Sequence, residues 1–127
     1  MLAGKALPLG TRGERYAAAY LRKQGMRVIA RNRTHGRGEI DLIAVEKEWL
    51  VFVEVRTRAS DEYMKPELSI RHEKRRTLVA TAKKLMRKHG RAGRRPRIDV
   101  VAIVWPAGAK KPASVTHYRG AIALGEW

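Results

Sequence analysis

Two acidic side chains lie within apolar segments that have the composition of buried β-strands. Asp41 interrupts the sequence IDLI at 40–43, and Glu54 interrupts the sequence FVEV at 52–55. An ionised carboxylate in a buried strand costs free energy unless a cation compensates its charge. Carboxylate oxygens are hard ligands that suit Mg²⁺ and Mn²⁺. The two acids therefore indicate either a metal site for phosphoryl chemistry or a structural ion pair with Arg56 or a helix residue.

A β-hairpin would bring the two acids together. If residues 47–48 form a two-residue turn, antiparallel pairing places Asp41 opposite Glu54. The same register places Glu39 opposite Arg56. Directly opposed side chains share one face of the sheet, with Cβ atoms ~5 Å apart. The turn lacks the Asn-Gly signature, and a three-residue turn would break this parity. A polar patch of Glu39, Asp41, Glu54 and Arg56 on one face of the sheet is therefore predicted only if the turn has two residues.

The overall charge indicates what kind of molecule such a site would meet. The 127 residues contain 28 lysines and arginines and 12 acids, a formal net charge of +16. A field of this sign attracts polyanions, so nucleic acid is the expected partner and a solvated basic surface is the alternative. No apolar run approaches the ~18 residues of a membrane span, so no membrane partner is expected. The absence of cysteine is compatible with the cytoplasmic location that we expect.

Basic residues near the acids are the best candidates for phosphate contacts. A basic, glycine-punctuated loop is expected at 31–38, and a second basic face is expected on a helix at 69–89. The candidates are Arg31, Arg33 and Arg37 in the loop and Lys83, Lys84, Arg87 and Lys88 on the helix. The four histidines show no metal-ligand spacing and are expected at the surface. For Asp99 a structural arginine partner is expected.

Hydrophobic periodicity predicts one α/β domain over residues 1–127, with a loose leader at 1–10 and a flexible loop at 106–114. The expected elements are a helix over 11–24, strands over 26–30, 39–45 and 49–55, a helix over 69–89, and strands over 98–105 and 115–118. Thr11 and Glu14 match a capping box at the start of the first helix, and Gly25 ends it. The expected architecture is one mixed sheet of about five strands with helices packed on it.

Four sequence segments resemble a known family. They are EIDLI at 39–43, VEVRTR at 53–58, KRRTL at 74–78 and IDVVA at 98–102. Their order and spacing are similar to the bacterial YraN family of uncharacterised proteins over roughly residues 10–124. That family is similar to the restriction-endonuclease-like, PD-(D/E)xK nucleases and most closely to archaeal Holliday-junction resolvases. The resemblance implies a restriction-endonuclease-like core and, because related resolvases act as dimers, a possible homodimer.

The resemblance also implies roles for individual residues. Asp41, Glu54 and the carbonyl of Val55 would bind Mg²⁺ or Mn²⁺, and Glu14 would be an accessory acid unless it serves the capping box. The family motif expects lysine two residues after the glutamate, where this chain has Arg56. An arginine keeps the positive charge but cannot take a proton from water. Lys74 could substitute, or it could be an ordinary exposed helix lysine.

These observations predict a metal-dependent endonuclease that acts on branched or otherwise structured DNA. The resemblance implies Glu14, Asp41, Glu54 and Arg56 as its catalytic residues. Because Arg56 replaces the expected lysine, the alternative is a nucleic-acid-binding protein on a nuclease scaffold that has lost catalysis. A basic protein that binds RNA is a third interpretation, although the chain has no RNP-type aromatic motif.

Overall fold

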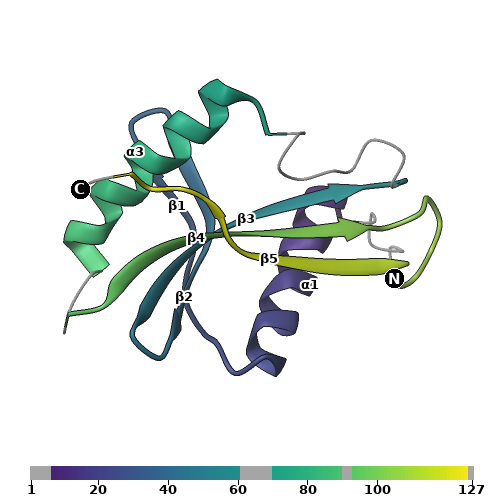
Figure 1. Cartoon of the computed structure of the whole chain (residues 1–127). Helices are drawn as coiled ribbons and strands as arrows, with labels where there is room; N and C mark the ends of the chain where they lie inside the picture. Colours follow the sequence, from purple (N-terminus) through teal and green to yellow (C-terminus); the bar gives the residue numbers. More distant parts are fainter. Residues whose placement is uncertain (1–6, 61–69, 90–92, 126–127) are drawn as a thin grey trace.

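The computed structural model describes residues 7–60, 70–89 and 93–125. The elements in chain order are α1 (Leu9–Lys23), β1 (Arg27–His35), β2 (Gly38–Glu46), β3 (Trp49–Arg58), α3 (His72–His89), β4 (Arg95–Val104) and β5 (Ser114–Ile122). The strands form one sheet in the order β1-β2-β3-β4-β5, in which β3 and β4 are parallel and the other neighbours antiparallel. Helices α1 and α3 flank it (Figure 1). The predicted α/β fold, with its mixed sheet and order of elements, is confirmed.

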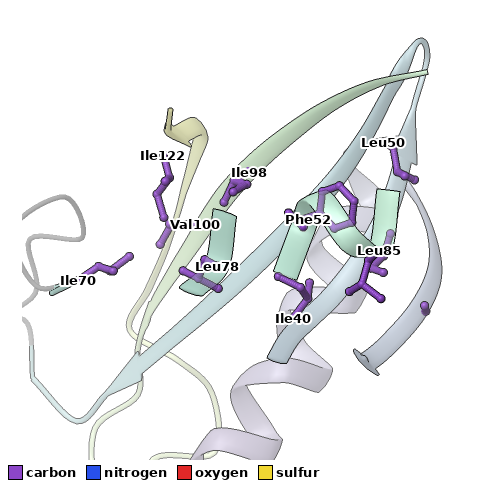
Figure 2. Close-up of a cluster of buried hydrophobic side chains, with 12 residues drawn as sticks. Ile40, Leu50, Phe52, Ile70, Leu78, Leu85, Ile98, Val100 and Ile122 are labelled. Carbon is purple, nitrogen blue, oxygen red and sulfur yellow. The ribbon is translucent and has the colours of Figure 1, made fainter. Parts of the chain in front are cut away.

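The hydrophobic core has one layer on each face of the sheet. Along β3, Leu50 and Phe52 pack in the layer beneath α3, whereas Val51 and Val53 pack in the layer beneath α1. Successive side chains of a strand point to opposite faces, so a nearly continuous apolar strand is covered on both sides. Figure 2 shows the α3 layer, in which Phe52 lies among side chains of the helix and the strands.

Helix α1 begins earlier than the capping box predicts. Pro8 is its N-cap residue, and no side chain caps the helix. The φ of −52° at Pro8 suits a helix start, and the carbonyl of Pro8 accepts a hydrogen bond from the N–H of Arg12 (3.0 Å). Thr11 and Glu14 therefore lie inside the helix, and the predicted capping box is wrong. Gly25, with φ of +91°, follows the helix end as predicted.

Strand β1 extends through most of the region predicted as a basic loop. Arg31 pairs with Leu42 and Arg33 pairs with Ile40, so residues 31–35 are part of the sheet. Only a short turn around Gly36 remains, where φ is +58°. The loop prediction was wrong because β1 is an edge strand whose side chains are mostly exposed. An edge strand tolerates charged residues at positions that a central strand would bury.

The hairpin between β2 and β3 has the predicted register. Lys47, with φ of +52°, and Glu48 form the turn, and pairing runs from Glu46–Trp49 to Leu42–Val53. The ladder does not continue to Asp41 and Glu54. On the N-terminal side of Leu42, strand β2 remains paired with β1 but no longer with β3. This separation leaves space for side chains between β2 and β3, where the Asp41 carboxylate contacts the backbone of β3.

The remaining boundaries differ by a few residues from the predicted ones. Helix α3 begins at His72, and the predicted start near residue 69 lies outside the described residues. Strand β4 begins at Arg95 and β5 extends to Ile122, longer at both ends than the short strand predicted near 115–118. The connection before β5 is closed by a hydrogen bond from the N–H of Ala113 to the carbonyl of Val104 (2.7 Å). None of the described helices has the length and apolar character needed to cross a membrane.

Candidate functional site

The two acids meet where β2 separates from β3. The Oδ2 atom of Asp41 accepts a hydrogen bond from the N–H of Val55 at 2.7 Å, in place of a backbone acceptor. The side chain of Glu54 is 5% exposed. Burial and the contact with the Glu54 carboxyl raise the pKa of Asp41 to about 7. The structure thus brings the predicted acid pair together, although through the side chain of Asp41 rather than through a ladder pair.

Lys74 completes the immediate surroundings of the acid pair. Its Nζ atom lies 3.3 Å from Oε2 of Glu54, and its side chain is 49% exposed. Lys74 is the third residue of α3, which packs across the same face of the sheet. The positive charge of Lys74 also acts to lower the pKa of Asp41. Lys74 is thus an exposed helix lysine, as one of its two interpretations has it, and it also forms an ion pair with Glu54.

Arg56 is a second cation close to the acids. It lies two residues after Glu54 on β3 and is half-buried. Burial lowers the pKa of its guanidinium, and the neighbouring charge of Arg58 acts in the same direction. The negative charges of Glu54 and Asp41 oppose both effects. A guanidinium remains protonated at any physiological pH, so Arg56 supplies a fixed positive charge.

Glu14 reaches the site from the opposite layer. Burial raises the pKa of its carboxyl, and the negative charges of Asp41 and Glu39 raise it further. The side-chain amide of Asn32 lies between Glu14 and Glu39, and its nitrogen can donate to both, at 3.0 and 3.2 Å. Asn32 was not a sequence candidate, and its φ of +47° is visible only in the structure. The structure therefore places Glu14 beside the acid pair instead of at a helix cap.

The donor set fits a hard cation held by two carboxylates. Asp41 and Glu54 repel each other unless a proton or a cation lies between them. Mg²⁺ is commonly bound by one or two carboxylates, with water or substrate oxygens completing the shell. Within the described residues, no three histidine or acidic side chains are grouped closely enough to hold a metal by themselves. A third protein ligand would thus be a backbone oxygen such as the Val55 carbonyl, whose residue is held beside Asp41.

A groove lies between the β1–β2 turn and α3, and it is lined in part by Lys74, the ion-pair partner of Glu54. One part, of about 350 Å³, is lined by the acids Glu39 and Glu73 and by Arg37, Lys74 and Thr77. The adjoining part shares Arg37 and Thr77 and is bordered by Lys84. The structure therefore brings two of the predicted phosphate contacts, Arg37 and Lys84, into one groove.

The other predicted contacts do not line this groove. Lys83 borders a separate hollow between α3 and the end of β5, together with Arg75 and Arg76. Arg31 and Arg33 are exposed on the edge strand β1. Arg87 and Lys88 are exposed near the end of α3. These residues lie on surfaces that only a large polyanion could contact together with the groove.

A second charged cluster lies on the α1 side of the sheet. Asp99 is fully buried and accepts two hydrogen bonds from Arg97, at 2.8 and 2.9 Å. His117 Nε2 and the N–H of Gly120 also contact its carboxylate, at 2.8 and 2.9 Å. These partners hold the pKa of Asp99 below its ordinary value despite burial. The predicted structural arginine is confirmed, whereas the prediction of surface histidines is wrong for His117, whose side chain is 4% exposed.

Comparison with known proteins identifies the family. The model of the uncharacterised protein family UPF0102 matches residues 13–103. A UPF0102 protein of Rhodococcus jostii is 42% identical over 115 residues, which cover 91% of this chain and 96% of that protein. UPF0102 proteins of Rhodopirellula baltica and Syntrophotalea carbinolica are 37% and 35% identical, over 89% and 95% of this chain and 69% and 96% of their own. The matched region includes every acid of the candidate site. The chain belongs to the uncharacterised protein family UPF0102, which is the YraN family that its sequence motifs resemble.

Proposed function

We propose that this protein is a Mg²⁺- or Mn²⁺-dependent endonuclease that acts on branched or otherwise structured DNA. The observation that carries the proposal is the contact between the carboxyl groups of Asp41 and Glu54. The ammonium of Lys74 lies beside this pair, 3.3 Å from Oε2 of Glu54. Two acids and a nearby cation are components of metal-assisted phosphodiester hydrolysis. The resemblance of the sequence to resolvase-like nucleases supports the same reaction and the DNA substrate.

Each residue of the site has a distinct task in this proposal. Asp41, Glu54 and the Val55 carbonyl would hold the cation, which would polarise a phosphoryl oxygen and acidify an attacking water. Lys74 is placed to stabilise negative charge that develops on the phosphate. An ammonium group can also exchange a proton, which the guanidinium of Arg56 cannot. Lys74 thereby compensates for the arginine at the position of the family lysine.

The groove beside α3 would guide the substrate. Arg37 and Lys84 line it, as does Lys74, which contacts Glu54. The net charge of +16 adds a long-range attraction for any nucleic acid. Arginine and lysine contacts to phosphates position a strand without reading its sequence. A substrate chosen by its shape, such as a junction or a flap, agrees with this arrangement.

The decisive experiment measures cleavage of junction, flap, single-stranded and duplex DNA in Mn²⁺ and in EDTA. We expect Mn²⁺-dependent cleavage by the wild type and none by Asp41→Asn, while calorimetry shows loss of Mn²⁺ binding in that variant. Arg22→Ala, at the far end of α1, is the control and retains cleavage. The absence of Mn²⁺ binding by the wild type would exclude the proposal.

The second candidate function is a nucleic-acid-binding protein without catalysis, which the arginine at position 56 favours. It predicts Mn²⁺ and DNA binding without turnover, both in the wild type and in Arg56→Lys. Competition between RNA and junction DNA in a gel-shift assay separates DNA binding from the third interpretation. Preference for RNA would favour a basic RNA-binding protein over both the endonuclease and the DNA-binding protein without catalysis.

A further inference from the structure

A small aromatic surface lies on α1, away from the acid pair. Tyr16 is 40% exposed, whereas most large hydrophobic residues in the described part of the chain are buried. Tyr16 contacts Trp105 edge to face, with ring centroids 5.8 Å apart and an interplanar angle of 81°. The guanidinium of Arg12 lies over the Trp105 ring, 5.0 Å from its centroid. An exposed ring held by a buried one and bordered by arginine is a rigid surface for stacking.

This surface forms a shallow groove of about 330 Å³. It is lined by Arg12, Arg15, Tyr16, Ala19 and Trp105. The Trp105 ring is fixed because its Nε1–H donates to the carbonyl of Ala109 at 2.8 Å. The volume is near the lower end of small-molecule sites, roughly 300–1,000 Å³, which suits one planar ring rather than a protein helix. Tyr16 is therefore accessible from solvent, while Trp105 next to it is held in place.

The charge of the groove indicates what occupies it. Arg12 and Arg15 border the aromatic ring, and no acid is among the described residues that line the groove. Residues 12, 15, 16 and 19 form one stripe along the helix, while Glu14 lies on the side that faces Asp41. A cationic, aromatic groove complements an anionic strand with an unpaired base, because bases stack on aromatic rings while the phosphates contact arginine.

We infer that the groove of Arg12, Arg15 and Tyr16 binds an unpaired nucleobase of a DNA strand. The inference deepens the proposed function, because it assigns a preference for substrates that contain single-stranded nucleotides. The groove and Glu14 lie on different sides of the same helix, which is roughly 10 Å across. A strand that crosses the beginning of α1 would therefore stack one base on Tyr16 and continue toward the acids.

The test compares the binding of a blunt duplex with that of the same duplex carrying an unpaired oligo-dT tail. Measurements in EDTA make the result independent of metal binding and cleavage. We expect the wild type to prefer the tailed duplex and Tyr16→Ala to bind it about tenfold more weakly, with unchanged affinity for the blunt duplex. Tyr16→Phe keeps the preference because its ring remains. Equal loss on both DNAs, or no loss, would overturn the inference.

Ile29→Ala is the matched control, because Ile29 is also 40% exposed but lies on β1. It leaves the tail preference intact. A tail containing 5-iodouracil provides a second readout, since irradiation should crosslink it to Tyr16. Crosslinks confined to α3 would contradict the inference, and so would conversion of a dimer to a monomer by Tyr16→Ala in sedimentation experiments. Asp41→Asn retains the tail preference if the inference is right, whether or not the wild type is a nuclease.

Discussion

At the scale of single residues, the position of a cation distinguishes this site from a simple acid pair. Lys74 contacts Glu54 from α3, whereas Arg56 occupies the motif position on β3. Under the proposed function, activity would depend more on where an ammonium group lies than on which residue follows Glu54 by two positions.

Replacement of Lys74 should separate catalysis from metal binding. We expect Lys74→Ala to reduce cleavage by about 10²- to 10³-fold, as the loss of one charge-stabilising group typically does. Mn²⁺ affinity should increase, because the ammonium no longer competes for Glu54. Single-turnover kinetics and calorimetry measure the two effects. Lys88→Ala is the control, since Lys88 is exposed on the same helix but near its end. If Lys74→Ala cleaves at the wild-type rate, Lys74 has no part in the reaction.

The Lys74→Ala variant also provides the background in which the role of position 56 can be tested. If the family position can hold the working cation, the double variant Lys74→Ala/Arg56→Lys should recover at least part of the lost cleavage. The physical reason is that lysine at position 56 would lie within the electrostatic reach of Glu54 and Asp41, as Arg56 does. Failure to recover, with DNA and Mn²⁺ binding intact, would mean that only the helix position serves the reaction.

Asp99 should make the protein sensitive to acid. The partners of Asp99 lower its pKa in the folded state. The charged form of Asp99 therefore stabilises the folded protein fully above the pKa of an unfolded aspartate, about 3.9. This stabilisation is lost as the pH falls through the lower pKa of Asp99 in the folded protein. Asp99→Asn should reduce the free energy of unfolding at pH 7 by about 3 kcal/mol, because it leaves Arg97 without its buried partner. It should also flatten the acid side of the stability profile.

Urea unfolding at pH values from 2 to 7 checks this prediction. Glu48→Gln is the control, because Glu48 is exposed in the β2–β3 turn. A variant at position 99 that loses stability equally at every pH would show that packing, rather than the charge of Asp99, stabilises this cluster.

At the scale of elements, two close approaches fix the helices on the sheet. A Cβ atom at Gly13 of α1 would lie 1.9 Å from Oγ1 of Thr57, and one at Gly38 would lie 1.8 Å from Oγ1 of Thr81. Neither position has room for a side chain. These contacts set the distance of α1 from β3 and of α3 from β2, and therefore the positions of Glu14 and Lys74 relative to the acid pair.

Two glycines of α1 offer a matched comparison. Alanine at either position improves the helix propensity by up to ~1 kcal/mol. A Cβ at Gly10 meets nothing within 4 Å, so Gly10→Ala should be neutral or slightly stabilising. Gly13→Ala should instead lower the free energy of unfolding by about 2 kcal/mol, since the helix must move away from Thr57. Thermal unfolding of both variants tests this, and equal melting temperatures would show that α1 can shift without cost.

The elements also show why local patterns predict some boundaries and miss others. The register of the β2–β3 hairpin was predicted correctly because the length of the turn fixes how two neighbouring apolar segments pair. The extent of β1 was missed because its basic residues have the composition of a loop, and only its place at the sheet edge makes them compatible with a strand. The start of helix α1 was predicted too late in the chain because Pro8, rather than Thr11, is its N-cap residue.

At the scale of the whole molecule, charge should govern DNA binding. The net charge of +16 makes the affinity fall steeply with salt concentration. If Arg37 and Lys84 both contact phosphates from the groove, each alanine substitution should lower the slope of log K against log salt by about 1. Fluorescence anisotropy at several NaCl concentrations measures these slopes. Arg22→Ala should leave the slope unchanged, and equal changes in all three variants would indicate a diffuse basic surface without a groove.

The sequence by itself determined the parts of this protein that depend on neighbouring residues. Apolar segments of strand length established the strands, and the acids within them indicated the site. The tertiary structure alone decided that Lys74 contacts Glu54, that Glu14 lies beside Asp41 and that His117 is buried. Each of these features depends on contacts between residues of different elements. Their positions follow from the packing of the helices on the two faces of the sheet, which no local pattern of residues encodes.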